Sequence, residues 1–375
     1  MDGGDLAQRL AARTLALLNI PSISRGEAAL HAHIAEEASR FLTIKVTDEP
    51  AHGILLERGK PRLILAGHFD TVPEQGNLEA RQDGDVIHGL GASDMKGALA
   101  VMLGLAGWLE RDRPETAMDV GFLFFAREEL PIGESALPAM FARCPQIKDA
   151  DLVLVMEPTD NTLQIGCLGN LNAELLFHGK SAHSARPWQG ENALHKAILG
   201  LQAIANGEPE PVEVGGLTYT EVLSLTKIEG GIAGNVIPDR VACHLNYRYA
   251  PNRSPEEAEA RVKALAPDSA DVRVIGNAPP ARAAIDNPLV RKLRQLGDLK
   301  VEAKQAWTPV AEFSAEGLDA VNLGPGMSRY AHQQDEQVRV SDLVTIYRLL
   351  QRFMVEVGDE PSQHSALRTQ DSGCS

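Results

Sequence analysis

The stretch that decides the fold is residues 63–73, LILAGHFDTVP, in which an apolar run of strand length ends at a glycine and is followed by His68 and Asp70. A continuous apolar run of this length is typical of a strand that is buried on both faces of a sheet. Ligands bind at the edge of a parallel sheet where such strands end, because loops and helix N-termini converge there. The sequence therefore places an imidazole and a carboxylate at a possible binding edge.

Helical and strand patterns alternate on both sides of this stretch. Residues 27–42 have helical spacing, residues 95–109 form a nearly all-apolar helical run, and residues 117–126 and 151–156 are further apolar strands. This order predicts an α/β domain with a mixed, largely parallel sheet flanked by helices.

The pattern changes at about Gly169 and returns to the first kind after Arg282. Between them, strand segments such as residues 170–179 alternate apolar and polar residues, with helical patterns at residues 192–204 and 254–266. Half-solvated strands covered on one face by helices are typical of a small α+β unit. The expected organisation is a discontinuous domain at 1–171 and 282–358, an insert at 172–281, and a polar, disordered tail at 359–375.

Composition excludes several classes of protein. The 375 residues include 51 acidic and 36 basic ones, a formal charge of −15, which disfavours nucleic acids and anionic membranes as partners. No apolar run approaches the ~20 residues of a membrane span. The first 21 residues form an amphipathic pattern, unlike a secretory signal. The four cysteines are scattered, which is typical of reduced thiols, and we expect a cytoplasmic protein.

Chemically active side chains recur where apolar strands end or where a turn precedes a helix. They include acids and histidines from distant parts of the chain, namely His68, Asp70, Asp94, Glu128, Glu129, Glu157 and His332. Because the carboxyl ends of parallel strands meet at one edge, we expect these side chains to gather there.

Each of these residues has a plain structural interpretation when it is taken alone. Asp94 could be a helix N-cap, His68 a hydrogen-bonded histidine, and Glu128 with Glu129 a solvated turn. Together they are harder to explain, since several carboxylates at one edge would cost several kcal/mol in repulsion and desolvation without a cation. Two histidines and at least three carboxylates suit Zn²⁺, Mn²⁺ or Co²⁺ better than Ca²⁺ or Mg²⁺.

The ordered motifs GHFDTVP, GLGASDMKG, AREEL, MEPT and YAHQQDEQV resemble those of the dinuclear zinc peptidase and deacylase family, the M20 metallopeptidases, which includes aminoacylases, carboxypeptidases and acetylornithine deacetylase. The resemblance covers almost the whole chain except the tail. Segments such as KSAHSARPWQGENALHK and GIAGNVIPD are similar to the desuccinylase branch of actinobacterial type. This resemblance implies a catalytic domain and a ferredoxin-like insert that serves as lid and dimerisation domain.

The resemblance also implies two metal ions that share one ligand. His68 and Glu157 would bind one ion, Glu129 and His332 the other, and Asp94 would bridge both. These ions would be Zn²⁺, with Co²⁺ or Mn²⁺ as substitutes.

Further roles follow from the same resemblance. Asp70 would orient His68, and a cis peptide bond would follow Asp94. Glu128 would be the general acid/base that accepts a proton from a water between the two ions and returns it to the departing amine. No G-x-S-x-G motif or cysteine nucleophile motif is evident, so hydrolysis without an acyl-enzyme is expected.

Four residues of the insert and of the loop after it are candidates for substrate contact. By resemblance, His183 would stabilise the oxyanion in the partner subunit's active site, Asn235 and Thr308 would contact substrate, and Arg248 would bind a substrate carboxylate. From spacing alone, His183 could be a turn histidine and Arg248 a strand-surface arginine. The chain departs from the family pattern at Glu312, where the family has an arginine before the Phe.

The activity that the resemblance implies is hydrolysis of N-succinyl-LL-2,6-diaminopimelate to succinate and LL-2,6-diaminopimelate, in lysine and diaminopimelate synthesis, by a cytoplasmic homodimer. Because Glu312 could disfavour an α-carboxylate, the alternative is a related hydrolase for N-acetylornithine, another N-acyl or carrier-linked amino acid, or dipeptides. A third interpretation is a binding protein that has lost its metals. The intact set of ligands argues against it.

Overall fold

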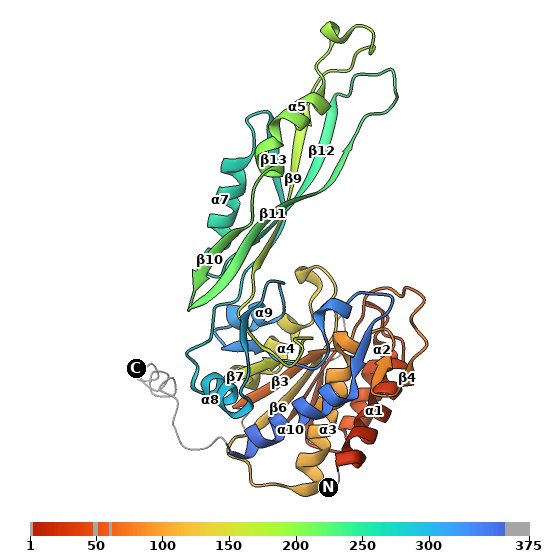
Figure 1. Cartoon of the computed structure of the whole chain (residues 1–375), viewed down its shortest axis with the longest axis vertical. Coiled ribbons are helices and arrows are strands. Elements are labelled where there is room, and N and C mark those ends of the chain that lie inside the picture. Colours follow the sequence, from red (N-terminus) through yellow and green to blue (C-terminus); the bar gives the residue numbers. More distant parts are fainter. Residues whose placement is uncertain (1–2, 48–51, 60–61, 357–375) are drawn as a thin grey trace. The chain divides into compact units, whose positions relative to one another are not determined.

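The structure is a computed structural model that describes residues 3–47, 52–59 and 62–356. The chain divides into two compact units (Figure 1). The first unit comprises Met1–Ile165, Ala284–Glu302 and Glu312–Ser375, and the second comprises Gly166–Ala283 and Ala303–Ala311. The tail expected to be disordered, residues 359–375, lies outside the described residues, which end at Glu356.

The first unit is built on a mixed eight-stranded sheet. Its strands, in spatial order, are β1 (Thr43–Thr47), β2 (Gly53–Glu57), β6 (Val120–Phe125), β3 (Leu63–His68), β7 (Leu152–Val155), β15 (Ala320–Asn322), β8 (Leu163–Ile165) and β14 (Val301–Ala303). The central strands β6, β3, β7 and β15 are parallel, whereas β1, β2 and β8 pair antiparallel with their neighbours. The predicted α/β class with a mixed, largely parallel sheet is therefore confirmed.

Helices flank this sheet. They are α1 (Gly3–Leu18), α2 (Ala28–Ala38), α3 (Gly97–Asp112), α4 (Leu137–Arg143), α8 (Pro288–Gly297), α9 (Val310–Ala315) and α10 (Val340–Glu356). Helix α3 contacts α1, α10, β3 and β6, and its residues are buried almost all round, as its nearly uninterrupted apolar sequence requires. A small antiparallel sheet joins β4 (Arg81–Asp83), β5 (Val86–His88) and β16 (Gln337–Arg339).

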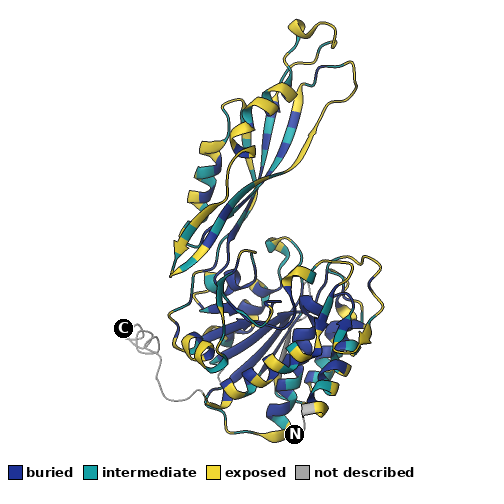
Figure 2. Ribbon diagram, viewed as in Figure 1, coloured by how far each residue is buried: buried dark blue, intermediate teal, exposed yellow. Residues whose placement is uncertain are grey.

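The second unit is a five-stranded antiparallel sheet with helices packed on it. The strands lie in the order β10 (Glu210–Val214), β11 (Leu217–Gly230), β12 (Arg240–Tyr249), β9 (Gly169–His178) and β13 (Ala270–Ala278). The helices are α5 (Ala193–Gly200), α6 (Gln202–Ala205) and α7 (Pro255–Leu265). Every second residue of β9 and β12 is buried (Figure 2), so the apolar alternation in the sequence marks the face that the helices cover.

Two details differ from the sequence-based expectations. Residues 303–311 pack with the second unit, because Trp307 Nε1 donates to the Pro279 carbonyl oxygen and Gln305 Oε1 accepts from the Thr220 amide. The helix expected over residues 192–204 is divided into α5 and α6 at Leu201. Among the described helices, none combines the length and the apolar character that a membrane span needs.

Candidate metal centre

Three adjacent parallel strands deliver the first candidate residues to one edge of the sheet. His68 is the last residue of β3 and is paired in register with Phe125, the last residue of β6. Glu128 and Glu129 follow shortly after β6, and Glu157 lies two residues beyond the end of β7. The side chains meet because β3 lies between β6 and β7.

Asp94 and His332 reach the same place from turns. Asp94 lies in the short π-type turn Ala92–Lys96 that precedes α3, and the peptide bond between Asp94 and Met95 is cis. His332 lies in the loop that follows β15 and has a φ of +60°, a conformation that few residues other than glycine adopt. The side chain of His332 is 51% exposed, whereas that of His68 is 1% exposed.

The two oxygens of Asp94 face two different histidines. Asp94 Oδ1 lies 3.1 Å from His68 Nε2, and Asp94 Oδ2 lies 3.5 Å from His332 Nε2. Glu157 Oε1 is 3.8 Å from His68 Nε2, and Glu129 Oε1 is 3.0 Å from His332 Nε2. Asp94 therefore stands between two groups of potential ligands.

The donor atoms of these two groups are close enough to hold metal ions. One group is His68, Asp94 and Glu157, the other is Asp94, Glu129 and His332, and within each the ligand atoms lie within 4.8 Å of one another. Imidazole nitrogen and carboxylate oxygen are donors that Zn²⁺, Mn²⁺ and Co²⁺ accept. The donor set thus fits two divalent ions that share Asp94.

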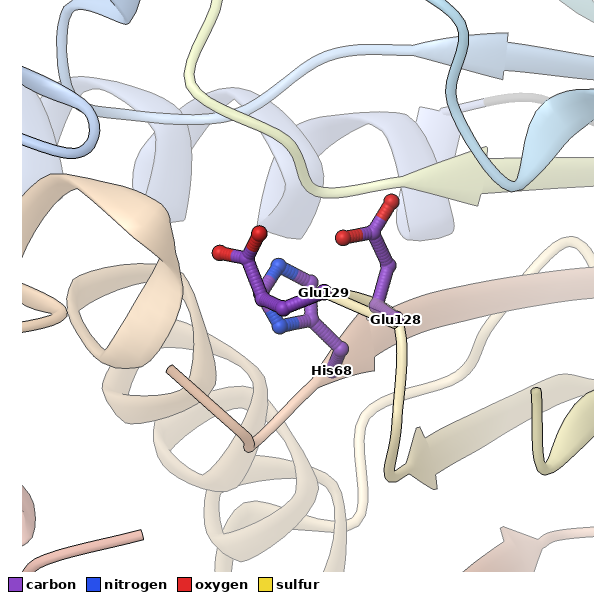
Figure 3. A group of neighbouring side chains, drawn as sticks. All are labelled: His68, Glu128 and Glu129. Atoms are coloured by element: carbon purple, nitrogen blue, oxygen red, sulfur yellow. The ribbon is translucent and has the colours of Figure 1, made fainter. Parts of the chain in front are cut away.

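Glu128 lies beside these groups (Figure 3). It can approach an ion together with His68 and Glu129, and the side chains of Glu128 and Glu129 extend from the loop after β6 to the region of the His68 ring. The two ligand groups that share Asp94, however, do not include Glu128. Its carboxylate is therefore available for proton transfer.

Asp70 is fully buried and connects His68 to the loop that carries both glutamates. His68 Nδ1 lies 3.1 Å from the backbone oxygen of Asp70 and 3.5 Å from its Oδ1, so both acceptors leave Nε2 facing Asp94. The Asp70 carboxylate also accepts the amides of Glu128 and Glu129 at 3.0 and 3.1 Å, and the hydroxyl of Ser24 at 2.8 Å. One carboxylate thus positions three site residues.

The acid–base balance of the cluster shows how strongly these groups interact. Burial lowers the pKa of His68, but hydrogen bonds to Asp70 and Asp94 outweigh it and hold this pKa well above its ordinary value. Hydrogen bonds to Asp94 and Glu129 raise the pKa of His332 to about 11. The acids thus favour positive charge on both histidines, and divalent cations would supply such charge.

The carboxyl groups respond to burial and to one another. Burial raises the pKa of Asp94, but the two histidines more than offset this and leave it below its ordinary value. Burial, followed by the charge of Glu157, raises the pKa of Glu128 well above its ordinary value, and burial also raises the pKa of Glu129. Like charges held this close in a protein interior are typical of a cation site.

The other candidates lie in the second unit. His183 and Asn235 are exposed neighbours, since His183 pairs with Val236 in an isolated bridge and the Asn235 carbonyl accepts the Ser184 amide. Arg248 on β12 is partly buried and its Nε donates to Asn246 Oδ1 at 3.0 Å. Thr308 is buried, and its carbonyl oxygen faces the Cys167 thiol.

Sequence reasoning missed two residues that hold the site in place, Ser24 and Glu336. Ser24 donates to Asp70, and Glu336 accepts the backbone amides of Gly91, Ser93 and Asp94. Glu336 lies four residues after His332 in an acidic stretch that is indistinguishable from a solvated turn. Only the structure shows that Glu336 is buried, with 2% of the residue exposed.

Comparison with known proteins agrees with this geometry. The model of the peptidase family M20/M25/M40 matches residues 64–356, most of the chain. The chain therefore belongs to this family of metal-dependent hydrolases, and the family predicted from the motifs is confirmed.

Two curated relatives are similar over most of their length. The putative succinyl-diaminopimelate desuccinylase DapE of Mycobacterium tuberculosis is 38% identical over 347 residues, which cover 91% of this chain and 96% of the relative. The succinyl-diaminopimelate desuccinylase of Corynebacterium glutamicum is 37% identical over 300 residues, which cover 79% and 81%.

The fold is shared with solved structures. A tripeptidase from Staphylococcus aureus superposes with a TM-score of 0.76 at 20% identity, covering 93% of this chain and 97% of that one. At this identity the likeness concerns the fold alone.

Proposed function

We propose that the chain hydrolyses the amide bond of N-succinyl-LL-2,6-diaminopimelate and releases succinate and LL-2,6-diaminopimelate, a step in lysine and diaminopimelate synthesis. The observation that carries the proposal is the position of Asp94 between two histidine–carboxylate groups, with Glu128 beside them. The substrate is inferred from the two relatives, which are named as succinyl-diaminopimelate desuccinylases.

In this proposal His68 and Glu157 hold one ion, Glu129 and His332 hold the other, and Asp94 contributes one oxygen to each. The ions are Zn²⁺, with Co²⁺ or Mn²⁺ as substitutes. When bound, two such ions would lower the pKa of a water molecule and polarise the amide carbonyl. They would also offset the negative charge around Glu128, which favours its carboxylate form.

Glu128 is then the proton carrier. Its carboxylate accepts the proton that the attacking water loses and donates it to the nitrogen of the departing amine. Asp70 supports this step, because its oxygens fix the amides of Glu128 and Glu129. The role of Asp70 is thus to hold the base and His68 in one arrangement.

The second unit would supply the contacts to substrate. Arg248 forms no ion pair with any residue that the structure describes, and only its Nε has a hydrogen-bond acceptor. A substrate carboxylate would complete this partly buried guanidinium with two parallel hydrogen bonds. Asn235 and Thr308 are the further contacts, and His183 would stabilise the oxyanion.

A second copy of the chain is the proposed partner. Helix α5 exposes Ile198 (53%) and Leu199 (69%), and beyond Glu221 the outer edge of β11 has no strand partner among the described residues. An apolar helix face and an open strand edge on one unit are typical of an interface. We propose a cytoplasmic homodimer formed through the second unit, with residues 172–281 as lid and dimerisation domain and residues 1–171 and 282–358 as catalytic domain.

Glu312 favours a second candidate substrate class. Its side chain is 8% exposed, and burial raises the pKa of its carboxyl to about 7. A carboxyl where the family pattern has an arginine would repel an α-carboxylate. The alternative is therefore a hydrolase of the same mechanism for N-acetylornithine or another N-acyl or carrier-linked amino acid, or for dipeptides.

The test is a comparison of kcat/KM for succinyl-diaminopimelate and for acetylornithine, made on protein whose metal content is measured. The proposed function predicts two ions per chain and a higher value for the succinylated substrate. A higher value for acetylornithine would establish the alternative. Protein that binds two ions and hydrolyses neither substrate would contradict both assignments of substrate.

A further inference from the structure

The turn that carries Asp94 is held by a buried carboxylate from the loop that carries His332. Glu336 Oε1 accepts the amides of Ser93 and Asp94 at 3.0 and 2.9 Å, and its Oε2 accepts the amide of Gly91 at 2.8 Å. Three amides from one turn thus converge on one side chain. Hydrogen bonds from amides to a carboxylate are stronger than those to a neutral acceptor, so this clamp is firm.

The same two segments are joined a second time. Ser93 Oγ accepts the amide of Met327 at 2.9 Å and donates to the Met327 carbonyl oxygen at 3.2 Å. Gly326 has a φ of +88°, and a Cβ atom there would lie 2.7 Å from Ser93 Oγ and 3.0 Å from the Ser93 backbone. The loop after β15 therefore packs directly against the Asp94 turn.

This arrangement matters most for the group formed by Asp94, Glu129 and His332. His68 ends β3 and Glu157 lies two residues after β7, and the amides that Glu336 accepts belong to neither of them. His332, by contrast, lies in a loop and is half exposed. Its distance to Asp94 depends on how the loop is fixed to the turn.

We propose that Glu336 is a positioning residue for the metal ion that Asp94, Glu129 and His332 would hold. It fixes the Asp94 turn against the His332 loop, so that Asp94 Oδ2 and His332 Nε2 stand at ligand spacing before an ion binds. The inference rests on the proposed function for the use of that ion. Glu336 is not itself a ligand, because both oxygens are occupied by amides and it belongs to none of the described ligand groups.

The test is metal affinity of the full-length variant Glu336→Gln, measured by titration with Co²⁺ and Zn²⁺ against a competing chelator. An amide side chain keeps the size but turns an N–H group toward a backbone N–H. The ion that Asp94, Glu129 and His332 would hold should bind about 10- to 100-fold more weakly, the range for residues that orient ligands. The ion that shares only Asp94 with this group should lose less affinity. Equal weakening of both ions, or unaltered affinity for both, would overturn the proposal.

A matched control separates positioning from general stability. Glu221 in the second unit is also buried, 1% exposed, and accepts the Ala250 amide and the Arg253 guanidinium. Glu221→Gln should lower the Tm and leave the affinity of both ions unaltered. Because these readouts are metal affinities, they do not depend on which amide is hydrolysed, and failure of the proposed substrate would appear only in the turnover assay.

A second measurement needs no variant. If Glu336 orders the turn, the amides of Gly91, Ser93 and Asp94 should remain as protected from hydrogen exchange in metal-free protein as in metal-loaded protein, followed residue by residue with NMR. Rapid exchange of these amides after metal removal would show that the ion orders the turn, and the proposal would be wrong.

Discussion

Two aspartates of this site each contact two partners, one with each carboxylate oxygen. Asp94 presents one oxygen to each histidine, and Asp70 presents its two oxygens to the amides of adjacent glutamates. In both cases a short, stiff side chain fixes the separation of its two partners. Longer side chains would allow that separation to vary, which is a reason for aspartate at both positions.

Glu128→Gln tests the proton carrier. The change keeps the size of the side chain but removes its ability to accept a proton, so kcat should fall at least about 100-fold while two ions remain bound. Glu134→Gln changes a partly exposed side chain that pairs with Arg25 and belongs to none of the described ligand groups, so kcat should stay near the unaltered value. Activity retained in Glu128→Gln would show that another group moves the proton.

Metal affinity should depend on pH. In metal-free protein the neighbouring acids raise the pKa of His332 to about 11 and also raise that of His68, so both rings hold protons more tightly than free imidazole does, and an ion must compete with those protons. Affinity should therefore increase with pH below the pKa of His332, about 11, by about tenfold per unit for each proton displaced. Chelator competition at several pH values measures this, and a flat profile would contradict the assignment of the histidines as ligands.

The residues of the site differ in how far the sequence reveals them. His68, Glu129 and Glu157 follow apolar strands, so topology alone brings them to one edge. Glu336 follows no apolar strand. Its role depends on which backbone amides face its carboxylate, and the local sequence does not show this. Those amides come from a turn more than 240 residues away in the chain.

At the scale of single elements, side-chain hydrogen bonds determine where a helix begins. Helix α7 begins with a capping box, in which Ser254 Oγ accepts the Glu257 amide at 3.2 Å and Glu257 Oε2 accepts the Ser254 amide at 2.8 Å. Both bonds satisfy amides that have no partner within the helix. The following Pro255 suits the first helical position, since it lacks an amide hydrogen.

Ser254→Ala should therefore lower the free energy of unfolding of the second unit by about 1 kcal/mol. Urea unfolding followed by far-UV circular dichroism measures this. Ser269→Ala, at an exposed serine after the same helix, is the control and should have little effect. Equal effects of the two changes would mean that the cap contributes nothing measurable.

Elements with a strong period were predictable, and short ones were not. Strands β3, β6 and β7 are continuous apolar runs, and β9 and β12 alternate, so each carries a pattern of its own. Among the three-residue strands, β15 lies in an apolar run, but β4, β5, β8, β14 and β16 are too short for any period and form because neighbouring segments hold them. The break between α5 and α6 at Leu201 directly follows Gly200, but a single glycine inside a helical pattern does not by itself predict a break.

At the scale of the whole molecule, the proposed role of His183 requires two chains. Mixing an inactive Glu128→Ala dimer with an inactive His183→Ala dimer should restore activity, because a mixed dimer has one site with both groups. Random exchange makes about half of the dimers mixed, so about a quarter of the unaltered activity is expected. Mixed dimers that form, as shown by differently tagged chains, but remain inactive would exclude action across the interface.

The division of the first unit into three stretches has a consequence for how the protein is made. Strand β7 ends at Val155, but its parallel neighbour β15 begins at Ala320, 165 residues later. At ribosomal speeds of about 5–20 residues per second, the free side of β7 stays without its partner for many seconds. Nascent chains therefore pass through a stage in which one edge of an apolar strand is unpaired. At this stage chaperones would bind the chain, and newly made molecules would be most prone to aggregate.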